Sequence, residues 1–415
     1  MPSPSPLLES DRGARLTREA LAEDLRDRVF RPGSAPRRIG AEIETLPVVA
    51  DTGRMAPILS ADSPATLPVL RRCAVEFGWS EGDHAGVPTF HTPEGTLVSF
   101  EPGGQIELSS APYTTIGELA RGLRQTLAHI RKAAEADGIR LLDVGMHPTA
   151  PVEETPLQTP VERYQRMDRY LSRIGPAGAR MMRLTAACQV NVDWGEEPAR
   201  VMRVLNAAAP LLTAIFANSP RRAGAAEGAA SHRALAWREL DGARTGLHGA
   251  GSVEEYLHFA LGAGAVLLGA PREEPLPFGE WVRRGEATLG DWRSHLSTLF
   301  PEVRPKGYAE VRCIDAVDPD WLEAPLVLVA ALTQPAALAE AEDLLGAPRP
   351  EALDAAARLG LGDAQMLRGA RGLWDLALDV ARKNDLSDPA SIEVARDFAD
   401  RFTRRGLAPA DSINL

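Results

Sequence analysis

The sequence is poor in cysteine, with only Cys73, Cys188 and Cys313 among 415 residues. Their odd number and wide spacing match neither a disulfide-bonded scaffold nor a zinc site, whose ligands come in closely spaced pairs. Cys188 and Cys313 fall on the apolar faces of predicted strands, so we expect buried, unbonded thiols. Such thiols suit a reducing compartment, and we expect a cytoplasmic protein.

Signals of several other protein classes are also missing. No apolar run reaches the ~18 residues of a membrane-spanning helix, so no membrane partner is expected. Residues 1–15 lack the apolar segment of a secretory signal, and we expect a flexible N-terminal tail there. The net charge is −11 without a basic stripe, which argues against a nucleic-acid partner.

Neither of the common phosphate-binding loops is present. The sequence has no P-loop motif and no glycine-rich dinucleotide turn after a predicted strand. Its eight histidines are scattered and form no zinc-protease motif. If the protein uses ATP, it therefore binds the phosphates in another way.

What the sequence does contain is a set of carboxylates in strand-like segments that lie far apart: 40–44, 101–107 and 308–312. Alternate side chains of an extended strand share a face. Glu42 and Glu44 therefore point one way, and Ala41 and Ile43 the other.

The same alternation recurs in the other segments. Gln105 and Glu107 share a face, and so do Glu310 and Arg312, in each case with apolar residues behind them. Segment 189–193 alternates its polar residues in the same way. Four segments thus predict polar strand faces.

Carboxylates that gather at one point need cations. Two unit charges about 4 Å apart repel by roughly 4 kcal/mol at an effective dielectric constant of about 20. Oxygen ligands without histidine or cysteine favour Mg²⁺, with Mn²⁺ possible, and Mg²⁺ on carboxylates usually also holds substrate phosphates. The residues therefore favour a Mg²⁺-dependent site for nucleotide chemistry.

Each segment also has a plainer interpretation. A Glu-x-Glu strand is usually a solvated sheet face, and Pro102-Gly103-Gly104 is usually a tight turn. One sequence does not show whether the four segments meet. Both interpretations stay open at this point.

The order of the elements predicts an α+β fold. Strands are expected at 38–49 and 98–109, a strong helix at 115–137, and almost continuous helix from about 319 to the end. Because strands and helices do not alternate regularly, a mostly antiparallel sheet is favoured over a doubly wound one. We expect a single domain over 16–415 with a helical C-terminal part.

Several motifs occur in an order that resembles the plant-type glutamate–cysteine ligase family, which includes bacterial members that open ergothioneine synthesis. They are Glu101–Ser109, Gln189–Asp193, Phe216–Pro220, Asp241–Gly246, Asp291–Leu296 and Phe300–Arg304. The resemblance implies a glutamine synthetase-like bowl, a curved antiparallel sheet covered by helices. It also implies ATP as co-substrate and γ-glutamylcysteine as product, formed through γ-glutamyl phosphate and serving glutathione or ergothioneine synthesis.

The resemblance also implies roles for particular residues. The implied metal ligands are Glu42, Glu44, Glu101, Glu107, Gln189 and Glu310. Glu310 and Arg312 are the implied catalytic residues, and Arg312 and Lys306 would contact ATP phosphates. Plainer roles are a structural Glu310–Arg312 pair and a solvated Lys306.

Substrate contacts are implied for Arg233, Arg244, Asn191 and Trp237, since an arginine fork suits the α-carboxylate of glutamate. Trp237 is equally compatible with an ordinary core position. His147 lies in a segment that departs from the plant pattern, where it is either a substrate contact or a solvated loop residue. Without an evident cysteine pair, redox regulation of the plant kind is not expected.

Three functions are compared. The first is a glutamate–cysteine ligase, the second a carboxylate–amine ligase with another acceptor, and the third an idle relative that binds nucleotide or amino acid. Glutamate, cysteine and ATP are the expected partners, and the protein is expected to be a monomer or a homodimer.

Overall fold

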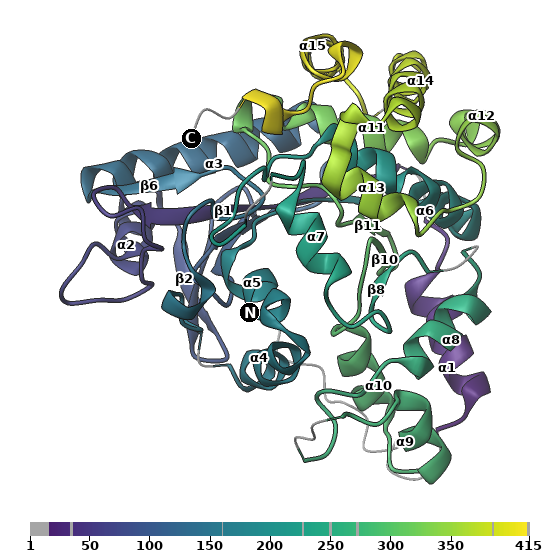
Figure 1. Cartoon of the computed structure of the whole chain (residues 1–415), viewed down its shortest axis with the longest axis horizontal. Helices are drawn as coiled ribbons and strands as arrows, with labels where there is room; N and C mark the ends of the chain where they lie inside the picture. The colour runs from purple at the N-terminus through teal and green to yellow at the C-terminus, as the bar shows by residue number, and fades with distance from the viewer. Residues whose placement is uncertain are drawn as a thin grey trace.

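The computed structural model describes residues 16–33, 36–159, 161–225, 228–248, 251–270, 274–383 and 386–412. The tail predicted at residues 1–15 lies outside these ranges. In the described chain, a large antiparallel sheet is covered by helices, which confirms the predicted α+β class (Figure 1).

The main sheet has nine strands. They are Ile39–Val49 (β1), Ser80–His84 (β2), Val87–His91 (β3), Leu97–Phe100 (β4), Ile106–Ser109 (β5), Ile139–Leu142 (β6), Cys188–Val192 (β7), Val303–Pro305 (β10) and Ala309–Val311 (β11). Their order is β10-β11-β7-β1-β5-β4-β3-β2, and β6 pairs with the second half of β1. Thr245–Gly246 (β8) and Phe300–Pro301 (β9) form a separate parallel pair. The long strand β1 is therefore the centre of the sheet.

Helices in the first two thirds of the chain lie on both sides of the sheet. They are Arg18–Asp24 (α1), Leu25–Val29 (η2), Thr66–Phe77 (α2), Ile116–Ala136 (α3), Val152–Glu154 (η3), Glu162–Ile174 (α4), Pro176–Leu184 (α5), Pro198–Ile215 (α6), His232–Arg238 (α7), Val253–Gly262 (α8), Phe278–Arg284 (α9) and Leu289–Leu296 (α10). In Figure 1, α3 lies on one side of β1, and α4 and α5 on the other.

The C-terminal part is helical, as predicted. Its helices are Pro319–Trp321 (η4), Glu323–Leu332 (α11), Pro335–Leu345 (α12), Ala352–Leu359 (α13), Gly360–Gly362 (η5), Ala364–Ala381 (α14), Pro389–Arg401 (α15), Thr403–Arg405 (η6) and Pro409–Ser412 (η7). Among the described residues no single helix is long and apolar enough to cross a membrane, although the bent pair Pro319–Leu332 and Pro335–Leu345 reaches that length and composition together.

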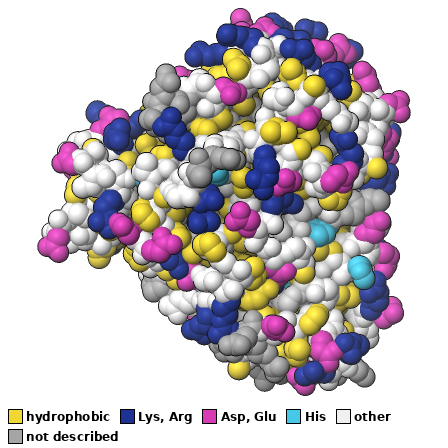
Figure 2. Space-filling model, in the orientation of Figure 1, with side chains coloured by type: hydrophobic (Ala, Val, Ile, Leu, Met, Phe, Trp, Pro, Cys, Tyr) yellow, Lys and Arg dark blue, Asp and Glu magenta, His cyan; other side chains and the backbone are white. Residues whose placement is uncertain are grey.

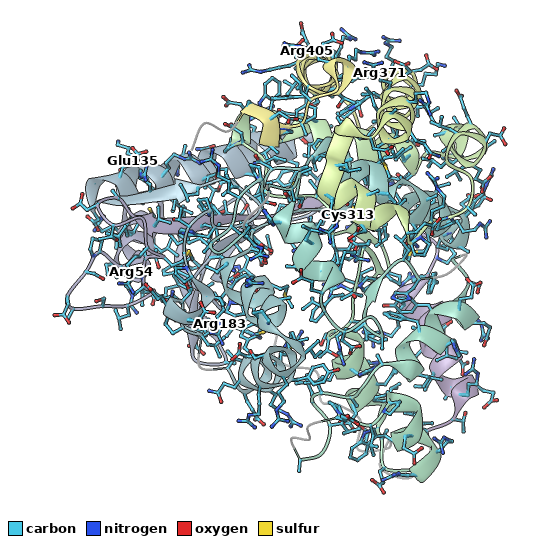
Figure 3. The ribbon with its side chains drawn as sticks, viewed as in Figure 1. Arg54, Glu135, Arg183, Cys313, Arg371 and Arg405 are labelled. Atoms are coloured by element: carbon cyan, nitrogen blue, oxygen red, sulfur yellow. The ribbon has the colours of Figure 1, made fainter. Side chains whose placement is uncertain are left out.

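The apolar face of the sheet packs against helices. Ile43, Leu108, Val190 and Val311 are each at most 6% exposed, and their cluster of buried side chains extends from Leu21 to residue 402. This leaves the opposite strand face to the polar side chains. All three cysteines are buried and unbonded, as predicted, and Figure 3 labels Cys313 in the interior beyond β11. The single-domain organisation stays a prediction.

The surface in Figure 2 mixes charges of both signs. Basic and acidic side chains alternate over the visible face, so the net charge of −11 is spread rather than gathered there. A cluster of glutamate side chains lies instead on the sheet face opposite the apolar one, where it lines a cavity.

Candidate active site

The acidic segments meet in the middle of the sheet, where β11, β7, β1 and β5 are successive neighbours. Three register pairs bring the predicted side chains together: Glu42 with Gln189, Glu44 with Glu107, and Glu310 with Asn191. Because paired residues point to the same face of a sheet, these side chains form one polar surface. The structure thus supplies the convergence that one sequence does not show.

A cavity of about 170 Å³ opens in front of this surface. The predicted residues that line it are Glu42, Glu44, Glu101, Glu107, Gln189, Arg233, Trp237 and Arg312. Methionine and aromatic side chains form the apolar wall: Met167, Met181, Met182 and Phe300. The site is therefore charged on the sheet side and apolar opposite.

Four glutamates on the sheet side, which we call the carboxylate group, are Glu42, Glu44, Glu101 and Glu107. Glu44 accepts hydrogen bonds from the backbone N–H of Ala187 (2.9 Å) and from Gln189 (3.1 Å). Glu107 accepts one from Ser109 (2.8 Å). None of the ion pairs found within the described ranges includes a member of this group.

Burial and repulsion make three of these carboxylates, Glu42, Glu44 and Glu101, hard to ionise. Burial, then Glu310 and Glu107, raises the pKa of Glu42 to about 6. Burial, then Glu107, raises the pKa of Glu44 to about 7. The pKa of Glu101 lies well above its ordinary value for the same two reasons, burial first and Glu107 second. Such a group favours bound protons or cations.

The donor chemistry of the carboxylate group fits a hard divalent cation. Its donor atoms are all carboxylate oxygens, the four side chains line one cavity, and none of them forms an ion pair within the described ranges. No three aspartate, glutamate, histidine or cysteine side chains in the described chain already stand in a metal-ligand arrangement. A cation would therefore draw these side chains together on binding.

Glu310 has very different surroundings. Its carboxylate is 0% exposed and bonds to three cations, which we call the cation group: Arg304, Lys306 and Arg312. Lys306 Nζ and Arg312 Nη1 donate at 3.0 Å each. Burial alone would raise the pKa of Glu310, but the cation group outweighs it and holds this pKa far below the ordinary value. A carboxylate so occupied is not placed as a metal ligand, and it does not line the cavity.

The cation group extends to the cavity through two of its members. Arg304 and Arg312 line the cavity, and Arg312 also donates to Gln189. Lys306 does not line it and is 37% exposed at its side chain. Arginine forks next to a carboxylate-lined cavity suit an anion such as a phosphate.

Arg233 and Trp237 come from helix α7. Arg233 is 3% exposed, donates to the carbonyl of Arg312 (2.7 Å) and lies 4.8 Å from the ring centre of Trp237. Its Nε has no hydrogen-bond partner among the described residues. A buried guanidinium with an unused donor, at a cavity wall, suits an anionic ligand, and its role as a substrate contact stays a prediction.

Arg244 and Asn191 are placed behind the cavity. The guanidinium of Arg244 is 1% exposed and bonds to Asp241 (2.9 Å), Thr298 (3.0 Å) and Gly264 (2.7 Å). Neither Arg244 nor Asn191 lines the cavity, and Asn191 donates to Glu42 at 3.3 Å. These bonds give both residues supporting positions, in contrast to the predicted substrate contacts.

The turn that carries Glu101 is held from outside. Gln158 accepts from the N–H of Ile58 (2.6 Å) and donates to the carbonyl of Gly103 (2.7 Å). A Cβ on Gly103 would lie 2.2 Å from the carbonyl of Arg183, so only glycine allows this approach. Gln105 belongs to the turn, where it donates to the carbonyl of Thr185 (3.0 Å). The Pro-Gly-Gly turn is therefore both a tight turn and a support of the site.

Sequence reasoning missed three titratable residues that line the cavity: Arg163, Tyr164 and Arg304. Arg304 ends a motif that was recognised without a role, whereas nothing in the sequence marked Arg163 or Tyr164. Glu101, followed by burial, raises the pKa of Tyr164, which shows how close this hydroxyl lies to the carboxylate group. His147 is 2% exposed and holds a loop through Gly53 and Ala150, outside the cavity lining.

Comparisons with known proteins identify the family of this chain. Residues 38–413 match the model of glutamate–cysteine ligase family 2. Glutamate–cysteine ligase EgtA of Mycolicibacterium smegmatis is 34% identical over 355 residues, which are 77% of this chain and 81% of that protein. The chloroplastic glutamate–cysteine ligase of Medicago truncatula is 34% identical over 236 residues, 52% of this chain and 46% of that protein.

Solved structures share the fold. A glutamate–cysteine ligase from Francisella tularensis in complex with AMP aligns with a TM-score of 0.54 at 14% identity, over 91% of this chain and 84% of that one. The expected ligase fold is thereby confirmed. With the family match covering nearly the whole chain and these relatives at 34% identity, this protein belongs to glutamate–cysteine ligase family 2 and is a ligase.

Proposed function

We propose that this ligase joins the γ-carboxylate of L-glutamate to the amine of L-cysteine, with cleavage of ATP to ADP and phosphate. The observation that carries the proposal is one cavity in which the carboxylate group and the arginines of the cation group face the same space. The relatives named glutamate–cysteine ligase support the choice of substrates.

The two charged groups suit the two halves of such a reaction. In the first, the γ-carboxylate of glutamate attacks the γ-phosphate of ATP and releases ADP. In the second, the amine of cysteine attacks the acyl carbon of γ-glutamyl phosphate, the C–O bond breaks, phosphate leaves and the amine loses a proton. Charge on the transferred phosphoryl group is the main obstacle.

Arg304 and Arg312 offer guanidinium donors to that phosphoryl charge, and Glu310 keeps both in place. Lys306 extends the same positive region toward the ATP phosphates. Arg233, which lines the cavity and has an unused Nε, would hold the α-carboxylate of glutamate. These arginines would thus orient two anionic groups, the phosphoryl group of ATP and the α-carboxylate of glutamate.

We propose that Glu42, Glu44, Glu101 and Glu107 hold Mg²⁺, with Gln189 beside them. When bound, the ion would neutralise phosphate oxygens and lower the repulsion within the carboxylate group. The observation in favour is a set of half-buried carboxylates that face one cavity and form no ion pair within the described ranges. The cytoplasmic location and the oligomeric state stay predictions.

The test is release of ADP from ATP and Mg²⁺ with glutamate, with and without cysteine, with the product identified by mass. We expect release to need both amino acids and to yield γ-glutamylcysteine. Equal rates with serine or alanine would replace this function with that of a ligase for another amine. ATP binding without any turnover would indicate an idle relative, and a Glu107→Gln variant serves as the matched low-activity control.

A further inference from the structure

A buried carboxylate beyond β11, Asp315, is not used by the reaction just described. It is 2% exposed and accepts hydrogen bonds from the backbone N–H of Asn218 (2.8 Å) and from the hydroxyls of Ser219 (2.7 Å) and Ser231 (2.9 Å). Its Oδ1 lies 3.7 Å from Nη1 of Arg233. Two of these partners, Ser231 and Arg233, belong to the start of helix α7.

The two serines link Asp315 to that helix. Ser231 is the N-cap residue of α7 and accepts from the N–H of Ala234 at 2.9 Å. Ser219 accepts from the N–H of Arg233 at 3.2 Å. A side-chain oxygen at a helix N-terminus satisfies backbone donors that the helix itself leaves unpaired. Asp315 therefore orients the hydroxyls that fix the helix carrying Arg233.

Asp315 is itself held in place. A Cβ added to Gly145 would lie 2.3 Å from Cγ of Asp315, so the carboxylate packs directly on the backbone of that glycine. With one side closed by Gly145 and the other by two serines, the carboxylate has one position. Its charge is accordingly fixed relative to Arg233.

A second carboxylate competes for Arg233. Glu44 of the carboxylate group lines the same cavity as Arg233, and Arg233 opposes the rise in the pKa of Glu44 that burial and Glu107 cause. Removal of the Asp315 charge would leave a buried guanidinium without its nearest fixed counter-ion, which is unfavourable. Arg233 would then turn toward Glu44 and leave its present position at the cavity wall.

From this arrangement we propose that Asp315 is a positioning residue, which sets the Arg233 guanidinium for the α-carboxylate of the amino-acid substrate and keeps it from pairing with Glu44. The proposal rests on the proposed function for the identity of that substrate. Asp315 touches neither substrate nor reacting atoms, because it lies outside the cavity lining.

Asp315→Asn tests the proposal, since the carboxamide keeps the shape and loses the charge. We expect the KM for glutamate to rise about tenfold or more, with kcat much less affected. The matched control is Glu323→Gln, which removes a buried carboxylate paired with Arg124 away from the cavity. This control should lower the unfolding temperature without changing the KM for glutamate.

Labelling with phenylglyoxal, followed by peptide mass analysis of the full-length protein, gives a readout that does not require turnover. Arg233 should be labelled faster in Asp315→Asn than in the wild type, and at the wild-type rate in Glu323→Gln. If the wild type makes no γ-glutamylcysteine, the proposed function fails, while the labelling rates still decide the role of Asp315.

Two results for Asp315→Asn would overturn the proposal. One is a wild-type labelling rate together with a KM change no greater than that of Glu323→Gln. The other is a KM for glutamate below that of the wild type. If Asp315→Asn does not fold, Ser219→Ala replaces it. That variant keeps the carboxylate and removes its link to the N–H of Arg233, so a smaller shift of both readouts in the same direction is expected. A folded Ser219→Ala protein with both readouts unchanged would equally refute the idea.

Discussion

Two regions on the same face of the sheet shift the pKa of glutamate in opposite directions. In the carboxylate group, Glu44 has a pKa raised to about 7, by burial first and Glu107 second. In the cation group, Glu310 is also buried, but three positive side chains hold its pKa far below the ordinary value. The partners of a carboxylate, more than its burial, decide which form is stable here.

The difference assigns complementary tasks to the two regions. Glu310 is one carboxylate shared by the three positive side chains of the cation group, and two of these, Arg304 and Arg312, line the cavity. The carboxylate group has no ion-pair partner within the described ranges and needs a cation. In the proposed function, one region would offer positive charge to phosphate, and the other would offer negative charge to a metal ion.

The largest expected effect is that of Glu310→Gln. The change leaves Arg304, Lys306 and Arg312 without their shared counter-ion, and breaking such a buried pair typically costs about 3–5 kcal/mol. Denaturant unfolding should show this loss of stability, and activity should fall with it. Adding Arg304→Met removes one stranded charge, so the double variant should lose less than the sum of the single ones. Additive losses would contradict the described cation group.

Glu107→Gln should separate activity from stability. Loss of one proposed ligand should lower kcat by about 100-fold or more. Because the change also removes repulsion with Glu44 and Glu101, metal-free stability should stay equal or rise. ADP release and thermal unfolding check the two parts. The matched control is Glu135→Gln on the outer helix α3, labelled in Figure 3, and wild-type kcat in Glu107→Gln would refute the metal role.

The smallest effect concerns pH and Mg²⁺. Since Glu44 titrates at a pKa of about 7 in the fold and near 4.5 without it, the folded state binds more protons between these values. Stability without Mg²⁺ should therefore fall as the pH rises from about 5 to 7. The contribution of Glu310 has the opposite sign, because it is present above pH 4.5 and is lost below.

Thermal unfolding in EDTA, repeated with Mg²⁺, measures this pH slope. Glu44→Gln should flatten it, and Mg²⁺ should raise the unfolding temperature most near pH 7, where the ligands are ionised. An equal slope in wild type and Glu44→Gln would show that Glu44 does not titrate in this range.

Much of the site was predictable because strand alternation is a local property. The alternation assigned Glu42 and Glu44 to the face opposite Ala41 and Ile43, and the structure confirms it. The order and spacing of the motifs were sufficient to predict the family, and the composition of the chain from about residue 319 predicted its helical C-terminal part. Arg163 and Tyr164 escaped notice because a single arginine or tyrosine on a helix carries no local signal.

The sequence by itself determined which side chains share a strand face, since the two-residue repeat of a strand fixes that without reference to the rest of the chain. Only the tertiary structure decided which faces meet and which charges become neighbours. Glu310 reads as one more carboxylate in the sequence and becomes the centre of three cations in the fold. In the sequence Arg244 resembles Arg233, but in the structure its guanidinium donates to backbone carbonyls of the protein. Electrostatic roles depend on distance and burial in space, and these are set by the packing of segments far apart in the chain.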